Sequence, residues 1–405
     1  MISREFQFLL NCLRAQPDVG SVRNLVHKGL NWQSILEIAQ RHGVRPLLRQ
    51  GLKFTCWDDV PQSTRFDLES FNRASLQRNL SYTSELLRLL KLFEQNGIAV
   101  AAFKGPVLAQ SVYGDLSLRE FNDLDIMVHQ ADLHKAEEIL IATGYAAQFP
   151  DADYRSTFVS YQGQYAFYSN RTGIWVDLHW KLSSKGVPFP IQTGEVWSRL
   201  RQVIIAGRAI PTLADDDLML YLAAHGTKEA WRRLIWICDF TNLLRNCRDI
   251  DWVEVLDRSH RSYSSRPLLL AIDLASTLLG APAPANLVDE ARTNSAVRAL
   301  SVKARARMLG TTTREEIGDF LNSLNTHDHF QHRLWLVISL LTTRTVGDFE
   351  AMRLPKLLWG IYYLTRPFRL AIKGVVMILK STNQSEGGPG SGLARVEAGN
   401  AGNAK

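Results

Sequence analysis

Hydrophobic residues recur at helical spacing in the first quarter of the chain. In the segment 84–97, SELLRLLKLFEQNG, leucines and a phenylalanine form one broad stripe between charged positions, and Asn96-Gly97 provides a stop signal. The same spacing returns at Asp215 and continues to about residue 345. The pattern predicts an N-terminal helical region over residues 1–96 and a C-terminal helical domain over residues 213–350.

The stretch between these two regions has a different pattern. NDLDIMVH alternates between apolar and polar residues, and QYAFYS is separated from GIWVDLHWKL by three turn residues, which predicts a hairpin. The expected strands cover 98–103, 122–129, 164–169 and 173–182, and the expected helices cover 106–113 and 131–144. The pattern therefore predicts an α+β protein in which residues 97–212 form a small mixed-sheet core.

Composition limits the class of protein. The chain has 405 residues, of which 46% are hydrophobic and 21% charged, which excludes a disordered, collagen-like or membrane-bundle protein. No run of about 18 apolar residues predicts a transmembrane helix. The N-terminus lacks a small-residue cleavage site, and the four cysteines form no C-x-x-C pair. These features predict a cytoplasmic protein.

The net charge of +7 lies almost entirely in one segment. Residues 351–380 contain six basic and no acidic residues, which leaves +1 for the remainder and gives no strong signal for nucleic-acid binding. This segment mixes aromatic residues with cations, which suits a helix lying on an anionic membrane or an acidic partner. The alternative is a terminal helical pair packed on the domain with its lysines solvated. The glycine-rich residues 381–405 predict a disordered tail.

Two aspartates mark the expected strand 122–129. Alternation places Asp123 and Asp125 on one face and the apolar residues on the other. Neighbouring carboxylates repel each other unless a cation lies between them, so the pair indicates a metal site, although a surface strand can also carry solvated aspartates. In the later strand, Asp177 and His179 share one face, and Asp177 is a candidate third carboxylate.

Basic residues flank these carboxylates. Lys104-Gly105 lies where a strand passes into a helix, and such a junction can hold an anion. Arg119 is interpreted either as a phosphate ligand or as an ion-pair partner of Glu120 or Asp115. His179 is interpreted either as a substrate contact or as a hydrogen-bond partner of a carboxylate.

Three further features have simpler interpretations. His225 is expected to cap the end of its helix. Asp239 is expected to be a buried partner of Arg232 or Arg233. The aspartates at 215–217 are expected to cap a helix and to occupy its first turn.

Several quoted segments together resemble a known superfamily: WQSILEIAQRHGVRPLL, then RNLSYTSELLRLLKLFEQNGIAVAAFKG, LREFNDLDIMV, VDLHWKL, LAAHG and RRLIWICDF followed by DW. They are similar to the nucleotidyltransferases typified by DNA polymerase β, and most similar to a bacterial branch described as uncharacterised nucleotidyltransferases. The resemblance extends over about residues 32–255. One departure is that Lys104-Gly105-Pro106 stands where the superfamily carries Gly-Ser.

The resemblance implies a chemistry. Asp123, Asp125 and Asp177 would bind two Mg²⁺ ions, and Asp177 could accept the proton of an acceptor hydroxyl. Lys104 and the amide of Gly105 would hold the phosphates of a nucleoside triphosphate, with Arg119 and His179 as further contacts. The product would be a nucleotidylated acceptor and pyrophosphate, and the acceptor would be a small molecule, a sugar or a protein.

Two other functions fit parts of the pattern. A glycosyltransferase with a D-x-D motif explains Asp123 and Asp125 but gives no role to Lys104 or Asp177. A non-catalytic helical protein, whose transferase-like core only binds a nucleotide or a partner, explains the fold without using the intact carboxylates.

Overall fold

The computed structural model describes residues 2–14, 16–148, 159, 162–183, 189, 191–247, 250–310, 326, 330–342, 348 and 351–372. The expected tail at 381–405 and the end of the basic segment at 373–380 lie outside these ranges. All four cysteines lie within them and are free thiols, as the sequence predicts.

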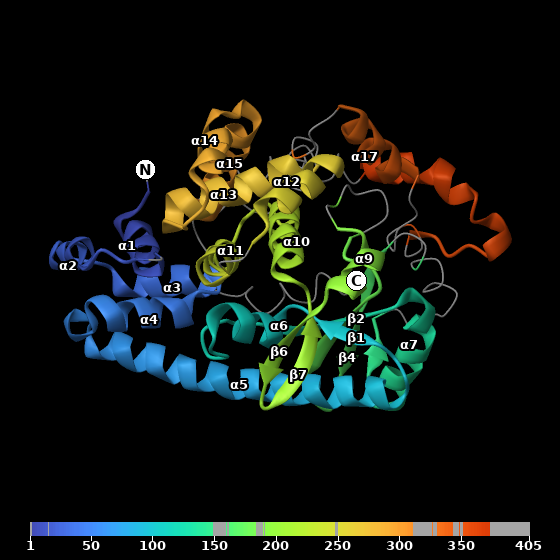
Figure 1. Ribbon diagram of the computed structural model, residues 1–405, viewed down its shortest axis with the longest axis horizontal. Coiled ribbons are helices and arrows are strands. Elements are labelled where there is room, and N and C mark those ends of the chain that lie inside the picture. The colour runs from blue at the N-terminus through green and yellow to red at the C-terminus, as the bar shows by residue number, and fades with distance from the viewer. Residues whose placement is uncertain are drawn as a thin grey trace.

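The N-terminal region is helical, as predicted. Side-chain oxygens of Ser3, Asp18 and Asn31 cap its first three helices by accepting backbone N–H groups that have no partner inside the helix. The helices are α1 (Arg4–Leu13), α2 (Val19–His27), α3 (Trp32–His42), α4 (Arg45–Thr55) and α5 (Gln62–Gln95). At 34 residues, α5 is long enough to reach from α4 to the far side of the sheet (Figure 1).

A mixed five-stranded sheet forms the core, as the alternating pattern predicts. Its order is β1-β2-β5-β4-β3; β2 and β5 are parallel, and the other pairs are antiparallel. The strands are β1 (Val100–Ala102), β2 (Asp123–Val128), β3 (Ala146–Ala147), β4 (Gln164–Ser169) and β5 (Ile174–His179). Between the first two strands lie a short helix α6 (Gly105–Leu108) and a π-helical turn η2 (Ala109–Tyr113).

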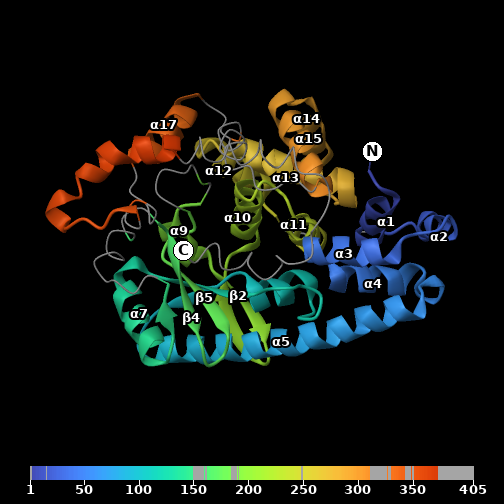
Figure 2. The same cartoon turned by 180° about the vertical axis from the view of Figure 1, so that it is seen from behind.

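The two faces of the sheet have different partners. Leu124, Ile126 and Val128 of β2 pack on a core that also contains leucines from the second half of α5. Helix α7 (Leu133–Ala142) packs into the same core. Figure 2 shows α5 running beneath the strands. The opposite face carries the polar residues of β2 and β5, so alternation places the chemistry away from α5.

The sequence pattern did not predict the segment that follows. Helix α9 (Thr193–Arg199) leads into an antiparallel hairpin of β6 (Arg201–Ile205) and β7 (Arg208–Thr212). Val203, Ile205 and Ile210 of the hairpin are buried in the core beneath the sheet.

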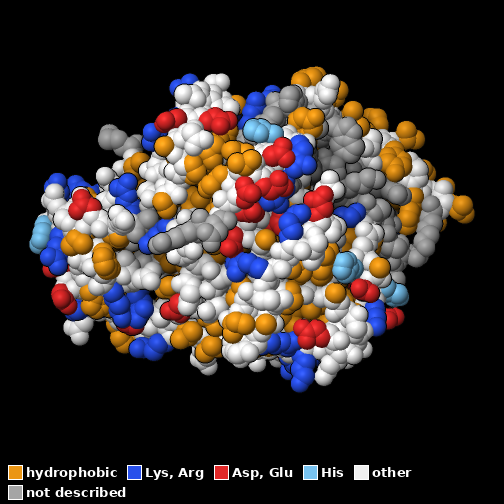
Figure 3. Space-filling view, in the orientation of Figure 1, with side chains coloured by type: hydrophobic (Ala, Val, Ile, Leu, Met, Phe, Trp, Pro, Cys, Tyr) orange, Lys and Arg blue, Asp and Glu red, His pale blue; other side chains and the backbone are white. Residues whose placement is uncertain are grey.

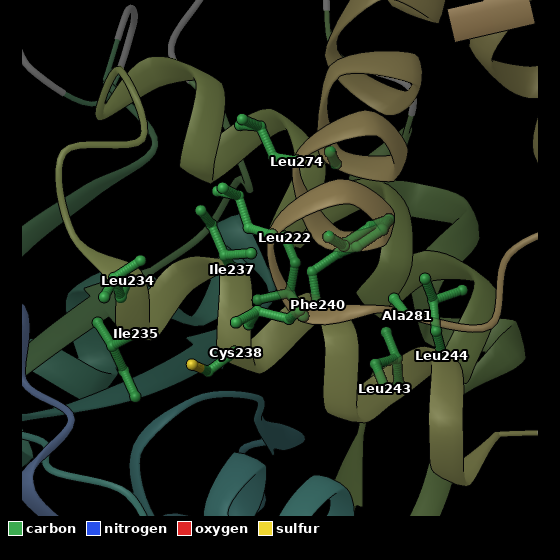
Figure 4. Close-up of a cluster of buried hydrophobic side chains, with 14 of the residues drawn as sticks. Leu222, Leu234, Ile235, Ile237, Cys238, Phe240, Leu243, Leu244, Leu274 and Ala281 are labelled. Carbon is green, nitrogen blue, oxygen red and sulfur yellow. The ribbon is translucent and has the colours of Figure 1, made fainter. Parts of the chain in front are cut away.

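Helices return at Asp215, as predicted. They are α10 (Asp215–Lys228), α11 (Leu234–Asn246), α12 (Trp252–Arg261), α13 (Ser265–Leu279), α14 (Ala285–Thr293), α15 (Ser295–Leu309) and α17 (Phe330–Thr342). Figure 4 shows how Ile237 and Phe240 of α11 lie among Leu222 of α10 and Leu274 of α13. These side chains belong to one buried cluster that also contains Phe8 of α1 and Leu48 of α4. The N-terminal and C-terminal helical regions therefore share a core.

The aspartates at the start of α10 differ from their expected role. They occupy the first turn, but the N-cap residue is Ala214, and it makes no side-chain cap. Asp217 is instead buried and accepts hydrogen bonds from Arg199 and Arg258. The ion pair compensates the burial of this carboxylate, which a solvated capping residue would not require. Among the described residues, no helix is long and apolar enough to cross a membrane.

Candidate functional site

Two aspartates face each other across neighbouring strands. The parallel register of β2 and β5 pairs Asp125 with Asp177 and Met127 with His179. Because side chains on paired positions project to the same face, the carboxylates of Asp125 and Asp177 lie side by side with His179 beyond them. Burial of apolar neighbours on the other face fixes this register, since a one-residue slip would turn the carboxylates into the core.

Asp125 is the most buried carboxylate of the group, with 2% of its surface exposed. Its Oδ1 accepts a hydrogen bond from Nζ of Lys104 at 2.6 Å and lies 3.1 Å from Nε2 of His179. Its Oδ2 is buried and has no hydrogen-bond partner. A buried carboxylate oxygen without a partner is costly, so Asp125 is half satisfied and keeps one ligand position open.

This open oxygen belongs to a group that can hold a cation. Ligand atoms of Asp125, Asp177 and His179 all lie within 4.8 Å of one another. Carboxylate oxygens are the ligands that Mg²⁺ and Mn²⁺ prefer, so the residues present fit a hard divalent cation. Asp123 is on the same strand and lines the adjoining cavity, but it is not a member of this three-residue group. Its expected role as a metal ligand stays a prediction.

The pKa values show how tightly the charges are coupled. Burial and the charge of Asp125 raise the pKa of Asp123 to about 6. The same two causes raise the pKa of Asp177 to about 6. Burial also opposes the ionisation of Asp125, but the Lys104 ammonium and the His179 hydrogen bond outweigh it and hold the pKa of Asp125 well below its usual range. The site therefore carries more negative charge than Lys104 alone can balance.

Lys104 and Gly105 lie where β1 passes into α6, as expected, and their expected phosphate contacts stay a prediction. The ammonium of Lys104 is paired with Asp125 and lies 5.5 Å from the ring centre of Tyr221. Gly105 has φ of +53°, and a Cβ there would lie 3.1 Å from the carbonyl oxygen of Asp123. Glycine is required because the turn has a left-handed conformation and passes close to the start of β2.

A cavity of about 660 Å³ opens beside these carboxylates. Lys104, Asp123 and Asp177 form one wall, and α10 forms another. The α10 wall includes Tyr221, Ala224, His225 and Lys228, which follow the i, i+3, i+4, i+7 spacing of one helical face, and Thr227 borders them. Lys181 and Gln164 complete the side next to β5. The cavity thus lies between the sheet and the C-terminal helices.

Sequence reasoning missed several of these lining residues. Gln164 donates a hydrogen bond from Nε2 to Oδ2 of Asp177 at 2.7 Å, and its position opposite His179 was readable from the hairpin. Tyr221 and Lys228 share a face with His225, so the helical spacing could have grouped them. His225 lies inside α10, next to the parallel ring of Tyr221, and burial lowers the pKa of His225 well below its usual value. It lines the cavity in the last turn of α10 instead of capping it.

Arg119 lies outside the residues that line the cavity. Its guanidinium forms two hydrogen bonds with the carboxylate of Asp239, at 2.9 and 3.0 Å, and Tyr113 donates a third bond to that carboxylate at 2.7 Å. The ion pair expected with Glu120 or Asp115 is therefore formed with a distant residue. Asp239 is a buried partner of an arginine, as expected, but the arginine is neither Arg232 nor Arg233. This geometry does not support a phosphate-binding role for Arg119.

A comparison with known protein families adds evidence that is independent of this geometry. Residues 28–280 match the family described as uncharacterised nucleotidyltransferase. The chain belongs to this nucleotidyltransferase family. No curated protein matches the sequence. Membership makes the protein a transferase in general terms and implies a nucleotide substrate.

Proposed function

We propose that this nucleotidyltransferase moves a nucleoside monophosphate from a nucleoside triphosphate to an acceptor hydroxyl and releases pyrophosphate, with Mg²⁺ as the required ion. The observation that carries the proposal is the paired position of Asp125 and Asp177 on adjacent parallel strands, with one oxygen of Asp125 buried and unpartnered. Two Mg²⁺ ions held by Asp123, Asp125 and Asp177 complete the proposal. When bound, the metal would supply charge neutralisation at the transferred phosphate.

The residues around the carboxylates have separable roles in this proposal. His179 orients Asp125 through its Nε2, and Gln164 holds one oxygen of Asp177. The other oxygen of Asp177 is the proposed acceptor of the hydroxyl proton, since Asp177 lines the cavity in which the acceptor would bind. Lys181 and Lys228 line the cavity and supply positive charge for the triphosphate, together with Lys104.

The two alternatives explain less of the structure. A D-x-D glycosyltransferase leaves Asp177 and its support by Gln164 without a role. A non-catalytic protein that binds only a protein partner has no use for a buried carboxylate group that costs stability to retain. Family membership also favours nucleotidyl transfer over both.

Incorporation of label from α-labelled nucleoside triphosphates tests the proposal. The purified chain would be supplied with Mg²⁺, each nucleotide in turn and a panel of acceptors, with pyrophosphate release as a second signal. Asp125→Asn should abolish both signals. Asp67→Asn, which changes an exposed aspartate on α5, is the matched control and should behave as wild type.

Metal binding gives a measurement that does not depend on finding the acceptor. Titration with Mn²⁺ should show binding by wild type and Asp67→Asn, and much weaker binding by Asp125→Asn. Equal Mn²⁺ binding by all three proteins would remove the structural basis of the proposal. Binding without label incorporation by any nucleotide and acceptor would favour the non-catalytic alternative.

A further inference from the structure

Helix α17 exposes a row of large apolar side chains. Phe330, Leu334, Ile338 and Leu341 follow one another at spacings of four, four and three residues and are all exposed. This spacing places them on one side of the helix. Leu336, on another part of the same helix, lines the cavity beside the carboxylates.

A second row follows in the chain. Residues 361–372 are helical and are preceded by the short helix η4 (Lys356–Leu358). The exposed apolar residues are spaced by four, three, four and four positions: Leu357, Ile361, Leu364, Phe368 and Ile372. Leu364 and Phe368 are each 72% exposed. We call these two rows the C-terminal apolar surface.

In the helix 361–372, buried and exposed side chains are the reverse of those in an ordinary surface helix, which buries apolar residues and exposes charged ones. Arg366 is buried, with 2% of its surface exposed, and its guanidinium pairs with the carboxylate of Asp348. Arg369 contacts the same carboxylate at 2.6 Å. The alternative expected from the sequence, a packed helical pair with solvated lysines, stays a prediction, because the lysine side chains of 351–380 lie outside the described part of the chain. The charges of the two arginines face inward and the large apolar side chains face outward.

The fold is ordered around this reversed arrangement. The hydroxyl of the buried Tyr362 donates a hydrogen bond to the backbone oxygen of Met352. The indole N–H of Trp359 donates a hydrogen bond to the backbone oxygen of Leu354. These bonds tie the helix to the segment before it, so the outward direction of Leu364 and Phe368 is fixed by internal contacts. Figure 3 shows hydrophobic side chains gathered along the rim formed by α17 and residues 351–372.

Charge indicates what the surface contacts. Residues 351–380 contain no acidic residue, and of their six basic residues Arg366 and Arg369 pair with Asp348, whereas Arg353 is exposed. The apolar spacing also continues in the sequence through Val376 and Leu379, between Lys373 and Lys380. Large apolar and aromatic residues combined with a net positive charge are typical of helices that lie in the interface of an anionic bilayer.

We propose that the C-terminal apolar surface docks the protein on an anionic lipid bilayer. The second row enters the interface between headgroups and acyl chains, and the exposed Arg353 contacts the lipid phosphates. Because α17 both carries the first row and borders the cavity through Leu336, docking holds the cavity next to the membrane surface. The inference does not depend on the proposed reaction.

Vesicle flotation of the full chain tests this proposal. Wild type should float with vesicles of equal phosphatidylcholine and phosphatidylglycerol, and much less with phosphatidylcholine alone. The double variant Leu364→Glu/Phe368→Glu should lower the partition coefficient between vesicles and water by about tenfold or more. The reason is that the variant lacks two apolar side chains whose transfer from water into the bilayer favours binding. Arg353→Glu should lower binding to the anionic vesicles only, by about fivefold.

The matched control is Phe66→Glu, which changes a phenylalanine of α5 that is 67% exposed and lies outside the surface. It should float as wild type does. All the changed side chains are exposed, and equal thermal unfolding of the variants would show that their folds are intact. Failure of wild type to float, or equal flotation of the double variant, would overturn the proposal. A third outcome is that wild type does not float but dimerises as its concentration rises, and that the double variant does not dimerise. This outcome would assign the surface to a second copy of the chain instead.

Discussion

Two buried aspartates differ in how completely their carboxylates are hydrogen-bonded. Asp125 lies beside the cavity, and Asp239 lies between the helices. Asp239 uses both oxygens: Arg119 binds them as a fork, and the hydroxyl of Tyr113 adds a third bond. Asp125 also pairs with a cation, Lys104, but leaves its Oδ2 buried without a partner. We refer to these regions as the open site and the closed junction.

The surroundings explain the difference. Around Asp125, the carboxylates of Asp123 and Asp177 add negative charge, and a cavity gives access to it. In the closed junction, one carboxylate meets one guanidinium, so its charges balance. A fully satisfied ion pair holds helices together, whereas an incompletely satisfied group beside a cavity is arranged for a ligand. The contrast between the two regions can be tested in four ways.

The largest effect is expected from Asp125→Asn in the open site. Label transfer should fall by about 10³-fold, because the variant loses a charged oxygen for the metal. The free energy of unfolding should fall by less than the roughly 3 to 5 kcal/mol expected when a buried ion pair loses one partner, because Asp123 and Asp177 still act on the ammonium of Lys104. Transfer assays and urea unfolding would measure the two quantities. A large loss of stability would mean that Asp125 is structural like Asp239.

Asp239→Asn should show the opposite result in the closed junction. It leaves the buried guanidinium of Arg119 without a charged partner, and the free energy of unfolding should fall by about 3 to 5 kcal/mol. Activity per folded molecule should stay close to that of wild type, since neither Asp239 nor Arg119 lines the cavity. Unfolding curves and transfer assays below the unfolding midpoint would measure this. If the stability were unchanged while activity fell, Arg119 would belong to the site after all.

A third test uses pH at another contact of α11, the one that it makes with α3. Nδ1 of His42 in α3 accepts a hydrogen bond from the backbone amide of Leu234 in α11, and burial lowers the pKa of His42 to about 4. In the unfolded chain the pKa is near 6.5, so the unfolded state takes up a proton first as the pH falls. The resulting stabilisation, about 3 kcal/mol, is complete above about pH 6.5 and is lost progressively toward pH 4.

His42→Gln removes this titration and keeps an acceptor for Leu234. The stability of wild type should therefore fall more steeply between about pH 6.5 and 4 than that of the variant, as measured by urea unfolding at several pH values. Parallel curves for the two proteins would show that His42 does not stay neutral in the folded state.

The smallest effect is expected from Gly105→Ala in the open site. The change strains a left-handed turn and brings the new Cβ to 3.1 Å from the carbonyl oxygen of Asp123. Gly173→Ala is the matched control, since Gly173 also has positive φ but has open space around it. In urea unfolding, the free energy of unfolding of the Gly105 variant should fall by about 1 to 2 kcal/mol more than that of the control. The Gly105 variant should also lose transfer activity. Equal losses would show that the close approach to β2 is unimportant.

Local patterns in the sequence predicted much of the open site. Alternation in β2 separated Asp125 from Leu124 and Ile126, and the hairpin placed Asp177 and His179 on one face. These predictions succeed because the two-residue period of a strand is a property of its own backbone. The residues of the cavity wall on α10 follow an equally local period, and the sequence contained that signal.

The sequence could not identify partners that are distant in the chain. Asp239 was expected to pair with its neighbours Arg232 or Arg233, yet it binds Arg119, which is 120 positions away. Likewise, the composition of the basic segment did not show that Arg366 is buried against Asp348. Such choices depend on which helices pack together, and helical spacing alone does not specify this.

The sequence by itself determined which residues share a face: the carboxylates of β2, the pair on β5 and the apolar stripes of the helices. The tertiary structure decided which faces meet. Only the parallel register of β2 and β5 places Asp177 beside Asp125, and only the packing of α10 against the sheet forms the cavity. The physical reason is that periodicity acts over a few residues of backbone, whereas burial and charge balance act among side chains brought together from the whole chain.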